Sequence, residues 1–74
     1  MHMAIPKVRL QLATQLRRIR RRLNLTQEEV AERAGLDARY YQRLESRKPG
    51  AIKIDTIDRL AKALKTTCSK LLDF

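Results

Sequence analysis

The chain has 74 residues, 43% of them hydrophobic and 34% charged, which allows one domain around one compact core. Two glycines and two prolines are too few for the frequent turns of an all-β fold. Lysine and arginine number 17 against 8 acids, and the resulting charge of +9 favours a nucleic acid, an anionic membrane or an acidic protein as partner. A basic surface that only keeps the protein soluble is the alternative.

Several classes are excluded on composition. The single cysteine, Cys68, and the single histidine, His2, cannot form an internal disulfide or a zinc site. We find no nucleophile–base set or glycine-rich phosphate loop, so we predict neither an enzyme nor a cofactor. No apolar run approaches the roughly 20 residues of a membrane span, and no signal peptide is apparent, so we expect a cytoplasmic protein without a membrane partner.

The first helix is predicted to begin near Pro6, and residues 1–5 are expected to be a disordered N-terminus or an expression scar, which leaves 6–74 as the domain. Asn24 is suited to end this helix in a left-handed conformation. One apolar face, which we expect to be buried, recurs at spacings of three and four, through Ile5, Val8, Leu12, Leu16, Ile19 and Leu23. The arginines that point away from this face are expected to be solvated, namely Arg17, Arg18, Arg21 and Arg22.

A second helix is predicted from Thr26, which has the position of an N-cap, with Glu29 completing a capping box. Val30 lies on its buried face. Gly35 is the expected stop, because glycine adopts the left-handed cap at little cost.

A third helix restarts at once, with Asp37 as its N-cap. Tyr41 and Leu44 are expected to face the core, whereas Arg39 and Arg43, four residues apart, face outward together. Two helices joined by so short a connection indicate a helix-turn-helix.

The remaining elements are two helices that follow a loop over residues 46–50. Asp55 is predicted to cap the first of them, with Asp58 reinforcing its start. Thr67 is predicted to cap a short last helix. Cys68 is expected to be a small buried side chain. The pattern therefore predicts an all-α fold.

Four stretches, in their order and spacing, resemble the XRE/Cro-type phage-repressor family over residues 12–72. They are Leu16–Arg20, Leu25–Ala31, Gly35–Glu45, and Asp55–Ile57 with Leu60–Leu64. The resemblance implies a lambda-repressor-like five-helix bundle with a central helix-turn-helix. It also implies a bacterial or phage protein that places its third helix, near residues 38–46, in the major groove of double-stranded DNA.

This resemblance assigns base contacts to the third helix. Arginine suits a bidentate contact to guanine, and the methyl group of Ala38 suits a thymine methyl. An ordinary solvated helix face is the alternative, and Arg43 is also suited to bind a phosphate. The expected base-contacting residues are Ala38, Arg39, Gln42 and Arg43.

Phosphate contacts are expected at the start of the second helix and in the basic loop. Tyr40 is as well suited to cover the core edge, and a solvated loop is the alternative for its lysines and arginine. The set comprises Thr26, Gln27, Tyr40, Arg47, Lys48 and Lys53. Arg20 and Glu45 occupy positions that pair in the family, and we expect a partly buried ion pair there.

The chain departs from the family at a few turns. Arg47 stands where the family commonly has glycine, which predicts a strained or altered turn. The loop before the fourth helix is one residue longer than usual. Asn24 and Lys65 also replace frequent glycines.

The resulting hypothesis is a transcriptional regulator that binds a pseudo-palindrome as a homodimer. Dimer contacts are expected from the loop after the third helix and from the last helices, where Leu71, Leu72 and Phe74 are expected to be partly exposed. One alternative is an antitoxin- or controller-type protein that also binds a protein partner. Another is a protein-interaction or RNA-associated module that reuses the fold.

Overall fold

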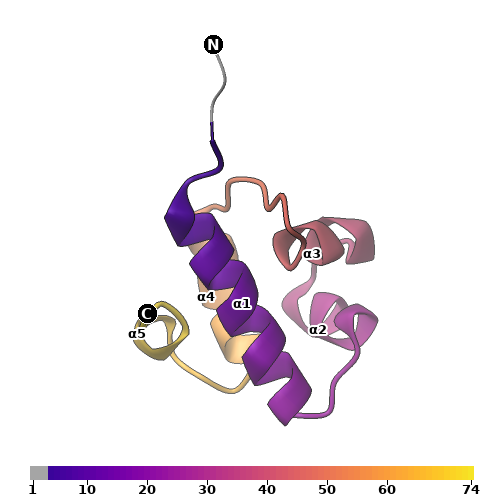
Figure 1. Ribbon diagram of the computed structural model, residues 1–74. Coiled ribbons are helices and arrows are strands. Elements are labelled where there is room, and N and C mark those ends of the chain that lie inside the picture. Colours follow the sequence, from indigo (N-terminus) through magenta and orange to yellow (C-terminus); the bar gives the residue numbers. More distant parts are fainter. Residues whose placement is uncertain (1–3) are drawn as a thin grey trace.

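The computed structural model describes residues 4–74, and within this range the chain forms five α-helices and no strand (Figure 1). The prediction of an all-α fold is confirmed. The expectations for Met1, His2 and Met3 lie outside the described residues. The helices are α1 (Lys7–Arg22), α2 (Gln27–Ala34), α3 (Ala38–Leu44), α4 (Ile54–Ala63) and α5 (Cys68–Leu71). None of them combines the length and the apolar character that a membrane crossing requires.

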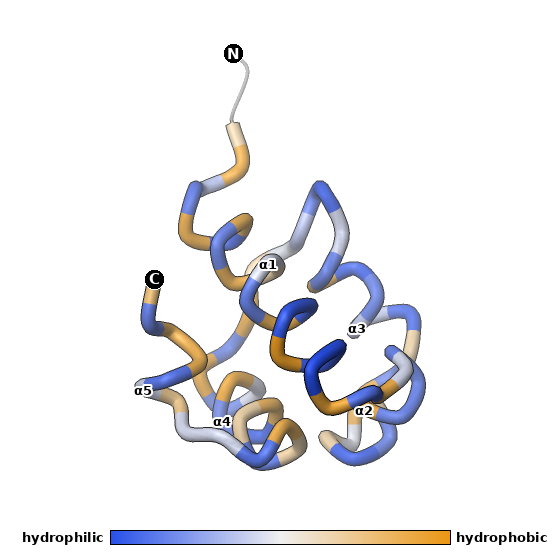
Figure 2. The backbone as a smooth tube through the Cα atoms, turned by 60° about the horizontal axis from the view of Figure 1, so that its bottom comes forward, coloured by the Kyte–Doolittle hydropathy of each residue, from blue (hydrophilic) through white to orange (hydrophobic). Residues whose placement is uncertain are grey.

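The longest helix, α1, separates two groups of shorter ones. Figures 1 and 2 both show α2 and α3 on one side of α1, and α5 with the C-terminal residues on the other. α4 joins the two groups, since it packs against both α2 and α5. α3 packs against α2, and its opposite side is left open.

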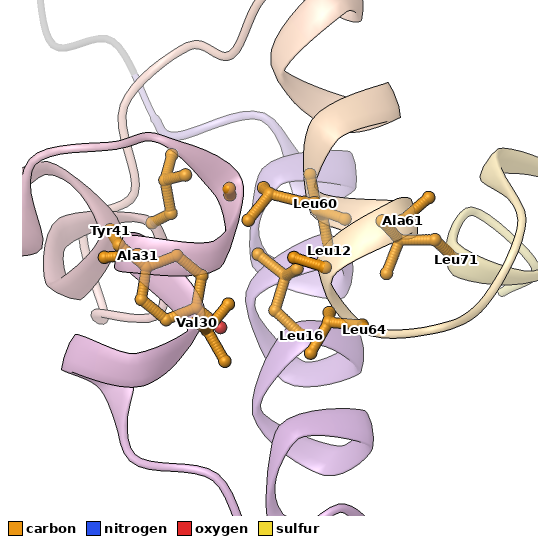
Figure 3. Close-up of a cluster of buried hydrophobic side chains, with 12 residues drawn as sticks. Leu12, Leu16, Val30, Ala31, Tyr41, Leu60, Ala61, Leu64 and Leu71 are labelled. Carbon is orange, nitrogen blue, oxygen red and sulfur yellow. The ribbon is translucent and has the colours of Figure 1, made fainter.

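The core lies where these helices meet, and every one of them contributes to it (Figure 3). Its largest fully buried side chains are Leu16, Val30, Tyr41, Leu60, Leu64 and Leu71. Burial of a large apolar side chain contributes about 1.5–3 kcal/mol. Leu71, which was expected to be partly exposed, is therefore a core residue, because α5 packs it inward between α4 and α1.

The apolar stripe of α1 is only partly buried. Leu12 and Leu16 are in the core, but Val8 is 54% exposed and Leu23 37%. The prediction that these two end residues are buried is wrong, because α1 spans about 24 Å and the shorter helices cover only its middle.

The predicted cap of α2 is confirmed. The Thr26 hydroxyl accepts a hydrogen bond from the Glu29 N–H at 3.1 Å, and the Glu29 carboxylate accepts one from the Thr26 N–H at 2.9 Å. Gly35 ends the helix in the left-handed region at a φ of 68°. The left-handed conformation expected at Asn24 is also present, at a φ of 57°.

The prediction that Asp55 caps α4 is wrong. The N-cap is Lys53, which makes no side-chain capping bond, and the helix starts at Ile54. Asp55 lies inside the first turn, where its carboxylate still interacts favourably with the helix dipole. Because the N-cap is Lys53, Asp58 lies beyond the first turn and does not reinforce the start of the helix. Its carboxylate forms an ion pair with Lys62 at 3.0 Å. The cap predicted at Thr67 is confirmed, since its hydroxyl accepts from the Lys70 N–H at 3.1 Å.

Candidate nucleic-acid interface

A tight turn connects α2 to α3 and fixes the angle between them. The Leu36 N–H donates to the Ala31 carbonyl at 2.8 Å, which closes the end of α2. Asp37 then caps α3, because its Oδ1 accepts from the N–H groups of Arg39 at 2.9 Å and Tyr40 at 3.2 Å. The turn therefore satisfies the backbone groups at both helix ends before any partner binds.

α3 presents one polar face to solvent. Arg39, Gln42 and Arg43 are exposed, and their spacing of three and four residues places them on the same side of the helix. Tyr41 and Leu44 are buried on the opposite side. The face is basic and free of apolar cover.

Two other residues of α3 that were predicted to contact DNA are less exposed than this face. Ala38 and Tyr40 are half-buried and pack against the core. The ring of Tyr40 therefore covers the core edge. The helix is also shorter than the expected 38–46, because Glu45 is its C-cap.

Glu45 forms a two-point ion pair with Arg20 beneath this end of α3. Its Oε2 accepts from Arg20 Nε at 2.7 Å, and its Oε1 accepts from Arg20 Nη2 at 2.9 Å. Arg20 Nη1 also donates to the Leu25 carbonyl at 2.8 Å, just before α2. One arginine thus joins α1, the start of α2 and the end of α3.

Gln27 belongs to the same network. Its Nε2 donates to Oε1 of Glu45 at 3.1 Å, which orients the amide at the start of α2. The second N–H of this amide and the first backbone N–H groups of α2 remain available to an anion.

Arg17 is a residue that the sequence did not point to. Its Nη1 donates to the backbone carbonyl of Glu45 at 2.9 Å, so it caps the end of α3 from α1. The expectation that Arg17 belongs to a solvated face is therefore wrong. Its position, three residues before Arg20 on the same side of α1, was the signal that could have indicated it.

Burial and hydrogen bonding act against each other on the Glu45 carboxyl. Burial raises its pKa, but the hydrogen bonds from Arg20 and Gln27 outweigh that effect, and the net pKa lies below its ordinary value of 4.5. The hydrogen bonds that Arg20 donates to the Glu45 carboxylate raise the pKa of Arg20. Glu45 is therefore held as a carboxylate at neutral pH.

Tyr41 lies next to this pair with its hydroxyl fully buried. Within residues 4–74 that hydroxyl makes no hydrogen bond of standard geometry. Burial raises the pKa of Tyr41, and the neighbouring Glu45 carboxylate raises it further by a smaller amount. The ring is thus a neutral core side chain that supports α3 from below.

For the loop after α3, the sequence predicted either a strained or an altered turn at Arg47. The turn is altered and not strained. The positive φ values within the described range belong to Asn24, Gly35 and Lys65, so Arg47 is not left-handed. Ser46 holds the turn, because its hydroxyl donates to the Arg43 carbonyl at 2.7 Å and accepts from the Lys48 N–H at 3.2 Å. Arg47, Lys48 and Lys53 are all exposed.

Two capped helices around a tight turn, with exposed arginines on the second helix, form a helix-turn-helix. A family model described as helix-turn-helix matches residues 16–71. The chain therefore belongs to this XRE/Cro-type helix-turn-helix family, whose members are DNA-binding regulators rather than enzymes. No curated protein and no solved structure matched.

Proposed function

We propose that this protein regulates transcription by inserting α3 into the major groove of an operator. The observation that carries the proposal is the exposed face of Arg39, Gln42 and Arg43 on a helix whose other side is buried. Arginine at such a face makes bidentate contacts to guanine, and Gln42 is suited to adenine. Ala38 supplies a methyl group at the start of the helix for a thymine methyl.

Phosphate contacts surround this face in the proposal. Gln27 is oriented at the start of α2, where the free backbone N–H groups and the helix dipole favour an anion. Thr26 adjoins it, with a hydroxyl that accepts from Glu29 and is still able to donate. The remaining candidates lie on α3 and in the segment that leads from it to α4, namely Tyr40, Arg47, Lys48 and Lys53.

We further propose that two copies bind a pseudo-palindrome with half-sites about 34–36 Å apart. Ile54 supports this, because it is 77% exposed at the start of α4, directly after the loop that follows α3. Leu72, at 38% exposure, is a further candidate. We place this activity on the DNA of a bacterium or phage, in the cytoplasm.

The experiment that tests the proposal is selection of bound sites from a random duplex pool. It should return two related half-sites with a defined spacing. The affinity for the selected duplex should fall steeply with salt, because phosphate contacts release counterions. Recovery of no preferred sequence, or an affinity that does not depend on salt, would contradict it.

Gln27→Ala separates phosphate contacts from base contacts. It should weaken binding to all duplexes about equally, whereas loss of a base contact should weaken mainly the selected sequence. Competition between the selected duplex and a shuffled duplex measures this ratio.

A controller- or antitoxin-type role, with a protein partner besides the promoter, is the second candidate. The observation that favours it is a groove between α1 and the C-terminal residues, lined by Leu10, Arg18 and Phe74 among others, on the opposite side of α1 from α3. A partner in this groove would leave α3 free for DNA.

A further inference from the structure

A groove runs along α1 on the side that faces α5. It consists of two hollows, one lined by Lys7, Leu10 and Phe74 and the other by Arg22 and Leu23. Gln15, Arg18 and Asp73 line both, so the two hollows adjoin at these residues, and we call them together the α1–α5 groove. Figure 1 shows that α5 and α3 lie on opposite sides of α1.

The floor of this groove is held by hydrogen bonds. Gln15 is buried, and its Nε2 donates to the carbonyls of Lys70 and Asp73, each at 3.2 Å. Its Oε1 accepts from Arg18, which positions that guanidinium over the groove. The groove is therefore formed before a partner arrives, and a partner would not need to order it.

The walls combine apolar surface with one sign of charge. Leu10 is 40% exposed, Leu23 37% and Phe74 48%. Of the charged side chains that line the groove, five are basic and one, Asp73, is acidic. The basic ones are Lys7, Arg18, Arg22, Lys65 and Lys70.

We propose that the α1–α5 groove binds an acidic amphipathic helix of another protein. An amphipathic helix docks its apolar side in such a groove and leaves its acids to face the basic rim. α1 offers about 24 Å of length, which matches a helix of about 16 residues. Because the groove lies across α1 from α3, the partner and the DNA can be bound at the same time.

The charge and the apolar surface of the groove argue against two other occupants. A second copy in a two-fold dimer would place the same surface against itself, and five cations would then face five cations. A DNA backbone would leave the exposed Leu10, Leu23 and Phe74 without an apolar partner. A helix that carries both acids and leucines complements both features.

The test uses a synthetic 16-residue peptide with leucines at every third or fourth position and glutamates elsewhere. Backbone amide signals of ¹⁵N-labelled protein are followed during titration, without DNA, so the result does not depend on the proposed operator binding. The shifts should centre on α1 and residues 70–74. Arg18→Glu should weaken binding by about tenfold, whereas Arg21→Glu, which makes the same charge change outside the groove, should weaken it by about twofold or less. A circular-dichroism spectrum of each variant verifies its fold.

Three outcomes would overturn the proposal. One is equal binding of a scrambled peptide without an apolar side, because charge alone would then account for it. Another is a set of shifts centred on α2 and α3. The third is a concentration-dependent shift of the groove residues without peptide, which would assign the groove to a second copy of the chain.

Discussion

The two sides of α3 differ in their exposure to solvent and in their hydrogen bonding. Arg39, Gln42 and Arg43 are exposed, and within residues 4–74 their side chains make no hydrogen bond or ion pair. Tyr41 and Glu45, on the inner side and at the end of the helix, are 0% and 2% exposed and lie against the Arg20 network. The side that we propose to meet DNA is thus energetically separate from the side that anchors the helix. Substitutions on the outer side should change binding alone, whereas those on the inner side should change folding as well.

The largest effect is expected on the inner side. Glu45→Ala leaves the largely buried Arg20 without its partner and should lower the free energy of unfolding by about 3–5 kcal/mol. Urea unfolding followed by circular dichroism measures it. Glu32→Ala, at an exposed acid of α2, is the matched control and should change stability by less than about 0.5 kcal/mol. A loss below about 1 kcal/mol at Glu45 would show that the pair is not an anchor.

The same pair predicts a dependence on pH. Because the pKa of Glu45 is lowered in the folded state, its contribution is complete above about pH 4.5, the ordinary pKa, and is lost as the pH falls through the lowered value. Protonated Glu45 still fills its site, so we expect a smaller loss than for Glu45→Ala. Unfolding of the wild type and of Glu45→Gln between pH 7 and pH 3 should give curves that converge as the pH falls. A constant difference would contradict this interpretation.

On the outer side, Arg39→Ala should reduce affinity for the selected duplex by about 1–3 kcal/mol and relax the preference at one base pair. Its free energy of unfolding should stay within about 0.5 kcal/mol of the wild type. Fluorescence anisotropy on the selected duplex and on single-base variants measures both affinity and preference. Uniform weakening across all sequences would reassign Arg39 to a phosphate.

The smallest effect on stability is expected at Arg17, which joins α1 to the end of α3. Arg17→Ala removes the donor to the Glu45 carbonyl, and we expect a loss of about 1 kcal/mol in the free energy of unfolding. Arg21→Ala is the matched control, because Arg21 is an exposed arginine of the same helix. Equal losses for both variants would mean that Arg17 acts only through its charge.

The parts of the fold that follow from local chemistry could be predicted from the sequence. Thr26, Gly35 and Asp37 satisfy backbone groups within a few residues of themselves, so their roles are visible in the chain. The spacing of Tyr41 and Leu44 likewise indicated their burial. The family match over residues 16–71 agrees with the resemblance found from those stretches.

The predictions that were wrong concern residues whose surroundings depend on which helices pack together. Val8 and Leu23 continue the apolar period of α1 but project beyond its neighbours, and periodicity carries no information about helix length elsewhere. Arg17 caps a carbonyl 28 residues away, a contact that needs the tertiary fold. Gln15 was missed for the same reason, because its partners are backbone groups near the C-terminus. The roles of individual residues toward DNA stay predictions.

The shortness of α3 has a consequence for the life of the protein in a cell. A helix of seven residues does not persist alone in water, so the surface that we propose to meet DNA exists only while the whole domain is folded. Any duplex that binds this surface therefore stabilises the native state by mass action, by an amount that grows with the logarithm of its concentration once that concentration exceeds its Kd. A copy bound to its operator should resist proteolysis longer than a free one, and the amount of protein should follow the number of sites it occupies.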